Sequence, residues 1–140
     1  MDQPLSFHDI PIRVRYAETD AMGFLHHSNY LVYFEEARTE LFRVRGGSYR
    51  RMEEMGFFFV VVGFQIRYHA PARYDDLLTV KVRESRQTAV KLEHEYEIWR
   101  DGAKLCSATS VLACTDRAGN VQRLTEVLPR VMGSSDSPPL

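Results

Sequence analysis

A carboxylate, a glycine and two adjacent histidines lie close together in the N-terminal part of the chain. Asp20 and Gly23 form an Asp-x-x-Gly sequence that is typical of a turn, and His26 and His27 follow it closely. A carboxylate can attack a carbonyl carbon or take a proton from water. Unpaired N–H groups in the first turn of a helix carry roughly half a positive charge, enough to hold an oxyanion. If a helix begins here, Asp20 could work beside an oxyanion pocket.

The segment after the histidines predicts a long helix that reaches about Arg45. Its apolar residues recur at steps of three and four, which places them on one helical face: Tyr30, Tyr33, Phe34, Ala37, Leu41 and Val44. Leu31 and Val32 make the first two turns apolar nearly all round, as in a helix buried by other structure. We expect Ser28 or Asn29 to cap the first turn with a side-chain oxygen.

Alternating apolar and polar residues indicate strands in most of the remaining chain. We predict strands over residues 8–16, 57–70, 78–83, 90–99 and 104–115, a short helix over 49–55, and a short addition to the sheet over 121–124. Residues 85–89 should form a hairpin turn, and Asp101-Gly102 is a strong signal for a second one. Ordered structure should end at residues 128–130, and residues 133–140 have the composition of a loose tail.

One strand is apolar on both of its faces. Every residue from Phe57 to Val62 is apolar, and Gly63 then interrupts the run at the position of an expected bulge. Such a strand needs cover on both sides. The helix could supply one cover and a second subunit the other.

The order of elements is one strand, a long buried helix and about four long antiparallel strands. This order predicts an α+β fold in which a curved antiparallel sheet of about five strands wraps around one central helix. We expect a single domain over residues 1–132, because no repeat or linker interrupts it.

Composition limits the function classes. The chain has 140 residues, a formal net charge of -1 and 44% hydrophobic residues, so there is no electrostatic case for nucleic acid as a partner. No run of about 18 apolar residues and no signal peptide is found, so we expect a cytoplasmic protein without a membrane span. Cys106 and Cys114 would lie roughly 26 Å apart on one strand, too far to pair, which suits buried thiols in a reducing compartment.

The motif around Asp20 resembles a known family. The matching run is Tyr16-x-x-Thr19-Asp20-x-x-Gly23-x-x-x-His27-x-x-Tyr30, followed by Tyr33-Phe34-Glu35-x-Ala37-Arg38. It is similar to acyl-CoA thioesterases of the 4-hydroxybenzoyl-CoA thioesterase type, in the hot-dog fold superfamily. The similarity extends in element order over residues 10–125, including Tyr68-x-x-Pro71-Ala72-x-Tyr74-Asp75-Asp76.

This resemblance implies hydrolysis of a thioester to a carboxylic acid and a thiol, usually coenzyme A. Whether the carrier is coenzyme A or an acyl carrier protein stays open. Asp20 matches the catalytic acid, which either attacks the carbonyl carbon or activates water. The backbone N–H of His27 matches the donor that polarises the carbonyl oxygen, while the role of its imidazole stays open. The superfamily also implies a homodimer joined edge to edge, with sites at the subunit boundary, and dimers that often pair into homotetramers.

The chemistry of these residue types agrees with that reading. Thiolate is a good leaving group, so one carboxylate and one oxyanion donor could suffice without a metal or an organic cofactor. His26 and His27 are adjacent rather than four residues apart, and the other histidines have no ligand spacing, so no metal site is expected.

Substrate-binding residues are expected near the turn and on the apolar strand. The candidates are Tyr16, Gly23, Tyr30, Phe59, Val61 and Arg86. Basic side chains that could bind the coenzyme A phosphates are Arg67, Arg73, Arg86 and Lys91. The aromatic candidates suit an aromatic or a medium aliphatic acyl group equally well.

Two other functions compete with hydrolysis. A hot-dog dehydratase would act on a hydroxyacyl thioester, and a non-catalytic module would bind acyl-CoA without cleaving it. Asp20 and Gly23 are both intact, which disfavours the module. A serine hydrolase is disfavoured because no Gly-x-Ser-x-Gly sequence is present.

Overall fold

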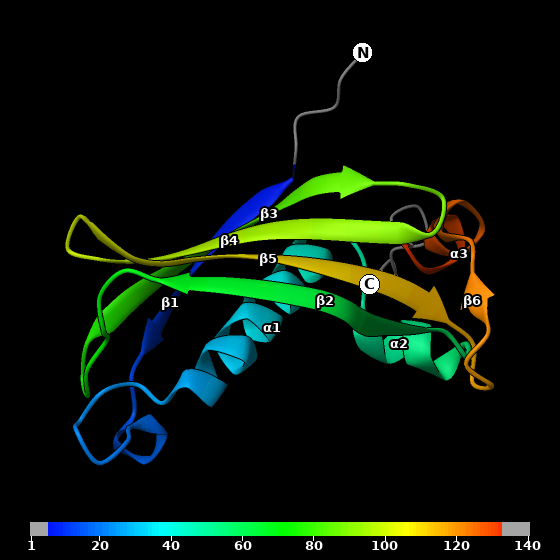
Figure 1. Ribbon diagram of the computed structural model, residues 1–140. Helices are drawn as coiled ribbons and strands as arrows, with labels where there is room; N and C mark the ends of the chain where they lie inside the picture. The colour runs from blue at the N-terminus through cyan, green and yellow to red at the C-terminus, as the bar shows by residue number, and fades with distance from the viewer. Residues whose placement is uncertain (1–5, 133–140) are drawn as a thin grey trace, which may run out of the picture.

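The computed structural model describes residues 6–132, in which an antiparallel sheet curves around one long helix (Figure 1). The elements are, in chain order, β1 (Phe7–Arg13), the short 3-10 helix η1 (Tyr16–Glu18), α1 (His27–Val44), α2 (Tyr49–Glu54), β2 (Phe58–Tyr68), β3 (Leu77–Gln87), β4 (Lys91–Arg100), β5 (Ala103–Thr115), β6 (Val121–Gln122) and α3 (Leu124–Val131). The predicted α+β hot-dog architecture is therefore confirmed.

The strands lie in the order β1-β3-β4-β5-β2, and the short β6 pairs with the end of β5. Consecutive strands β3, β4 and β5 form hairpins, and the expected turn at Asp101 and Gly102 has positive φ angles of 49° and 84°. The register of β2 on β5 shifts between Val61 and Gly63, so the bulge predicted there is present. β3 continues to Gln87, which makes its hairpin turn shorter than the predicted 85–89.

Helix α1 packs one face against the concave side of the sheet. Tyr30, Tyr33, Phe34, Ala37 and Leu41 are buried, as their spacing predicts. The prediction for Val44 is wrong, because 57% of its surface is exposed.

The buried face of α1 turns toward α2 in its last turns, and Phe42 takes the place expected for Val44. Phe42 packs edge-on against Tyr49 of α2, with ring centroids 5.4 Å apart. Its ring lies so close to Gly47 that a Cβ there would come within 2.6 Å. The two helices therefore share a corner that only glycine permits.

Apolar side chains form two clusters that are separated by a polar layer. The first cluster lies under the N-terminal part of α1, and the second lies between its C-terminal end, α2 and α3. His94 and Ser110, which face each other on β4 and β5, are buried between them. Arg38 reaches the same layer from α1 and donates to the hydroxyl of Tyr96 at 3.4 Å.

The chain does not lose its order at residues 128–130, because α3 continues to Val131. Leu124, Val127 and Val131 are buried on the second cluster. Pro129 lies inside the helix, where it removes only one backbone donor, and the buried apolar stripe outweighs that loss. The tail predicted at residues 133–140 lies outside the described residues.

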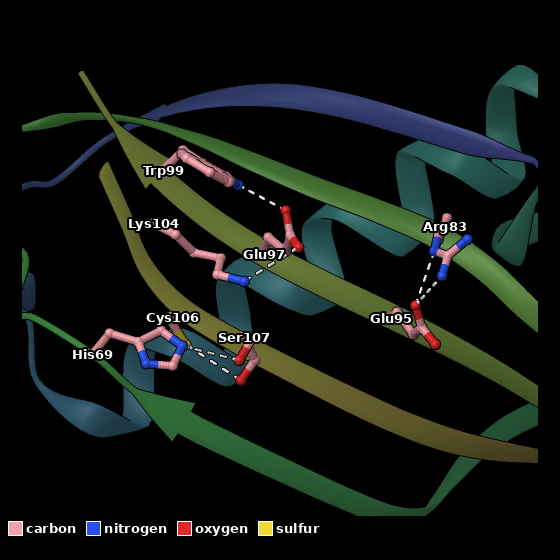
Figure 2. A network of polar contacts seen from close by, with 8 residues as sticks. All are labelled: His69, Arg83, Glu95, Glu97, Trp99, Lys104, Cys106 and Ser107. Carbon is pink, nitrogen blue, oxygen red and sulfur yellow. Dashed lines mark hydrogen bonds and ion pairs between the residues drawn. The ribbon is translucent and has the colours of Figure 1, made fainter. Parts of the chain in front are cut away.

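Both cysteines are free and buried on β5, as expected. The sheet face that points away from α1 is charged (Figure 2): Arg83 pairs with Glu95, and Glu97 accepts a hydrogen bond from the Trp99 indole N–H at 2.8 Å. Among the helices of residues 6–132, none is long and apolar enough to cross a membrane.

Candidate active site

The turn that contains Asp20 is closed by four hydrogen bonds. Its Oδ1 atom accepts the backbone N–H groups of Met22 at 2.8 Å and Phe24 at 3.1 Å. The backbone N–H of Asp20 donates to the Phe24 carbonyl, and the N–H of Gly23 donates to the Asp20 carbonyl. Gly23 has a φ of +81°, which a residue with a side chain adopts only with strain. The carboxylate is thus fixed through one oxygen, and its other oxygen has no partner among residues 6–132.

Helix α1 begins directly after this turn, and its cap differs from the prediction. His26, rather than Ser28 or Asn29, is the N-cap residue, and its Nδ1 atom accepts the backbone N–H of Ser28 at 3.1 Å. Because Nδ1 accepts this hydrogen bond, the proton of the neutral His26 ring lies on Nε2. The rings of His26 and His27 stack with centroids 4.3 Å apart, so the cap also orients the second imidazole.

His27 is the first residue of α1 and is exposed. Within the part of the chain that the structure describes, no acceptor takes its backbone N–H. The first N–H groups of a helix carry its positive dipole end, where an oxyanion is stabilised. The turn and the helix start therefore present a free carboxylate oxygen and a free N–H donor on neighbouring segments.

Sequence reasoning missed Glu18, which ties the turn to the helix. Its carboxylate accepts the hydroxyl of Tyr33 at 2.6 Å and three N–H groups of Arg15 at 2.9–3.2 Å. Burial raises the pKa of Glu18, but these hydrogen bonds and the charge of Arg15 outweigh it and hold the pKa below its usual value. The spacing Arg15-x-x-Glu18 was the only local signal, and it also fits a surface ion pair.

Tyr30 lies beneath the turn and is 97% buried, with 3% of its surface exposed. Its ring meets Tyr68 of β2 edge-on at 4.9 Å. Burial raises the pKa of Tyr30 to about 12, and the charge of Asp20 makes a smaller contribution in the same direction. Leu25, which comes directly after the turn, is buried in the same apolar cluster as Tyr30.

Two further predicted residues border the turn. Tyr16 is 77% exposed and packs edge-on against Tyr74 at 5.6 Å, so it is a surface residue and not part of the first strand. The Arg73 guanidinium lies 4.6 Å above the Phe24 ring. Of the four candidate phosphate ligands, Arg73 is the one that contacts this loop, where it also pairs with Phe24 in an isolated antiparallel bridge.

The other candidates do not join Asp20 within one chain. Phe59 packs on Phe42 and Tyr49 in the second cluster, roughly 30 Å along β2 from the Tyr68 end that meets Tyr30. Val61 lies two residues further along β2 and is exposed. Arg86 and Lys91 flank the β3–β4 hairpin at the far end of the sheet.

A groove of about 860 Å³ lies on the charged outer face of the sheet. Arg67 lines it, whereas Asp20 and His27 do not. Its lining includes cross-strand ion pairs such as Lys81 with Asp9. Asp20 and His27 are both exposed in the single chain. No group of three or more potential metal ligands occurs among residues 6–132.

Comparisons with known proteins agree with the fold. The family model described as "Thioesterase superfamily" matches residues 22–107. Acyl-CoA thioesterase YbgC of Haemophilus influenzae is 37% identical over 117 residues, which cover 83% of this chain and 84% of that protein. The putative acyl-CoA thioesterase YneP of Bacillus subtilis is 37% identical over 107 residues, covering 76% and 78% of the two chains.

Solved structures are similar over nearly the whole described chain. The DHNA-CoA thioesterase from Staphylococcus aureus has a TM-score of 0.85 at 28% identity and covers 89% of this chain and 85% of its own. A probable thioesterase from Bartonella henselae has a TM-score of 0.81 at 34% identity, with 84% and 98% covered. The chain therefore belongs to the thioesterase superfamily and is a thioester hydrolase with the hot-dog fold.

Proposed function

We propose that this protein hydrolyses acyl-CoA thioesters, with Asp20 as nucleophile or general base and the His27 N–H as oxyanion donor. One observation carries the proposal: the Asp20 carboxylate is held by two backbone N–H groups beside a helix start whose own first N–H is free. The names of the Haemophilus and Bacillus relatives support acyl-CoA as the substrate class.

The reaction needs little beyond these two groups. In one route a free oxygen of Asp20 attacks the thioester carbonyl carbon, the C–S bond breaks, and water then hydrolyses the resulting anhydride. In the other route Asp20 takes a proton from water, which attacks the same carbon directly. In both, the carbonyl oxygen gains negative charge that the His27 N–H would stabilise, an effect worth about 3 kcal/mol per donor in other enzymes. Neither route requires a metal or an organic cofactor.

The site would be completed by a second copy of the chain. β2 is an edge strand, and Val60, Val61 and Val62 on it are 40%, 51% and 58% exposed. An exposed apolar edge is a site for strand pairing. Antiparallel pairing of two β2 edges would bring the start of one strand beside the end of the other. The partner's Phe59 and the partner's Val61 would then approach the Tyr68 end, near Asp20, where an acyl group must lie.

Arg73 is the best placed of the basic candidates to meet a phosphate group of coenzyme A. Its contact with Phe24 leaves the guanidinium beside the turn, and phosphate favours such donors. An acyl carrier protein would present the same pantetheine thioester without the nucleotide, so the carrier is decided by experiment. The two free, buried thiols suit a reducing compartment, and we place the activity in the cytoplasm.

The test is release of free thiol from a panel of aromatic, short, medium and long acyl-CoAs, by the wild type and by Asp20→Asn. The asparagine keeps an oxygen that can accept the N–H groups of Met22 and Phe24, so the variant should fold. We expect turnover to fall by at least about a hundredfold. Unchanged turnover would overturn the role of Asp20, and a wild type inactive on every acyl-CoA would overturn the substrate class.

A further inference from the structure

We infer that Glu18 is a positioning residue that fixes the Asp20 turn on helix α1 for turnover. Among residues 6–132, Glu18 is the one buried carboxylate, with 8% of its surface exposed. A buried carboxylate is costly unless its oxygens are satisfied. Glu18 meets this condition with partners on both sides of the Asp20 turn, Arg15 before it and Tyr33 after it.

The side chain of Glu18 reaches the helix. Its Oε1 atom accepts the hydroxyl of Tyr33, which lies on the second turn of α1 and is 2% exposed. Tyr33 lies six positions after His27, or about 9 Å along the helix axis. The hydrogen bond therefore holds the loop against α1 at a point well inside the helix and not only at its frayed end.

The backbone of Glu18 reaches the helix start. Its carbonyl oxygen accepts the N–H of His26 at 2.9 Å and the side-chain amide of Asn29 at 3.0 Å. Thr19 then pairs with Leu25 in an isolated antiparallel bridge. Two residues after Glu18 comes Asp20, and one residue after His26 comes His27. One residue thus sets the separation between the carboxylate and the oxyanion donor.

Arg15 alone would not supply this control. Its guanidinium meets Oε2 of Glu18 at 3.0 Å, but its side chain is 76% exposed, so solvent screens the ion pair. The Tyr33 hydroxyl is the buried partner. Burial and the neighbouring Glu18 raise the pKa of Tyr33, so it stays a proton donor. Tyr33→Phe removes this single contact and leaves the apolar packing of the ring in place.

The inference rests on the proposed function, and its experiment separates the two. Glu18→Gln and Tyr33→Phe are compared with the wild type for kcat and KM on the best acyl-CoA, and again in the Asp20→Asn background. Glu126→Gln is the matched control, because Arg123 and Glu126 form an exposed pair of the same spacing at the start of α3. Thermal unfolding verifies that each variant folds.

We expect Glu18→Gln and Tyr33→Phe to lower kcat by about 10- to 100-fold with KM changed less than about twofold, since a shift of the order of 1 Å can cost that much. Glu126→Gln should leave both constants unchanged. In Asp20→Asn, the two variants should cause no further loss, because they act through Asp20. A general structural defect would instead lower the residual rate by the same factor as in the wild type, and this would overturn the inference.

Folded variants with unchanged kcat would overturn the role of Glu18 while the proposed function stands. If Glu18→Gln does not fold, the kcat and KM of Tyr33→Phe alone test the inference. If the wild type cleaves no acyl-CoA, the proposed function fails, and amide hydrogen exchange decides the inference separately. Tyr33→Phe should then speed exchange in residues 19–26 and not in β4 or β5, whereas unchanged exchange in that loop would contradict it.

Discussion

Asp20 and Asp116 close two turns that have the same pattern of hydrogen bonds. Each Oδ1 atom accepts the N–H groups two and four residues later, at 2.8 and 3.1 Å for Asp20 and at 2.9 and 2.9 Å for Asp116. Each aspartate is followed after three residues by a glycine with positive φ, +81° at Gly23 and +88° at Gly119. The first turn leads into α1 and the second into β6. Because the same turn also occurs away from a helix start, the turn alone does not define the candidate site. Substitutions at Asp116 can therefore serve as controls for substitutions at Asp20.

Asp20→Ala and Asp116→Ala should both weaken their turns and affect activity differently. Each change removes the acceptor of two backbone N–H groups, so both should lower the thermal midpoint; the fall should be at least as large for Asp116→Ala, because Oδ2 of Asp116 also accepts the side-chain amides of Asn120 and Gln122. Only Asp20→Ala should lower thiol release, by about a hundredfold or more, because only Asp20 faces the helix start. Thermal unfolding and a thiol assay measure the two effects. Equal losses of activity in both variants would show that Asp20 is a turn residue and nothing more.

Gly23→Ala and Gly119→Ala extend the comparison to backbone strain. A Cβ at either position would meet nothing within 4 Å, so the cost is the positive φ alone, about 1 kcal/mol. Urea unfolding should give similar losses for the two variants. Turnover should fall only for Gly23→Ala, since relief of the strain would move the Asp20 carboxylate. If Gly119→Ala loses turnover to the same extent, the effect is global and not local to the site.

His94 should make the fold sensitive to acid. Burial first, and then the charges of Arg38 and Arg45, lower its pKa from 6.5 to about 3. Its Nδ1 atom has no partner among the described residues, and Glu84 and Ser110 are its neighbours across the sheet. Above pH 6.5 the folded and unfolded states both hold a neutral ring. Between pH 6.5 and 3 the unfolded state binds the extra proton, so the free energy of unfolding falls as pH falls.

The decrease in the free energy of unfolding that is due to His94 should approach about 1.4 kcal/mol per pH unit in that window. His94→Gln removes the titration, so its free energy of unfolding should depend less on pH between 6.5 and 4. Urea unfolding at several pH values measures the slopes. His69→Gln, a change at an exposed histidine on the outer face, should keep the wild-type slope. Identical slopes for the wild type and His94→Gln would contradict the prediction.

Val61→Lys should break the proposed dimer. Lysine on an edge strand opposes pairing with another strand, because its charge would be buried in the contact. Light scattering should show a wild-type dimer or tetramer and a Val61→Lys monomer, with thiol release reduced about tenfold or more. Val121→Lys is the control, since Val121 is an exposed valine on the short strand β6. A wild type that is monomeric and fully active would remove the need for a second copy at the site.

Local patterns predicted the elements well where the interaction partners are near in sequence. The stripe from Tyr30 to Leu41 follows from helical periodicity, and the Asp101-Gly102 turn follows from the φ angles that glycine tolerates. Helix α3 was missed because Pro129 disfavours a helix locally, whereas its apolar stripe finds cover only in the folded chain. Burial of Val44 was predicted wrongly because, in the last turns of α1, the face that packs on α2 carries Phe42 and not Val44.

The family, the hot-dog fold and the placement of Asp20 beside a helix start could all be predicted from the sequence, because they depend on a contiguous motif and on hydrophobic periodicity. Three features could be seen only in the folded chain: Glu18 is buried against Tyr33, His26 caps α1, and Phe59 lies in a different cluster from Tyr30. The sequence does not show whether a given carboxylate is solvated or buried. Its environment depends on which distant segments the fold packs against it, and that is set by the whole chain at once.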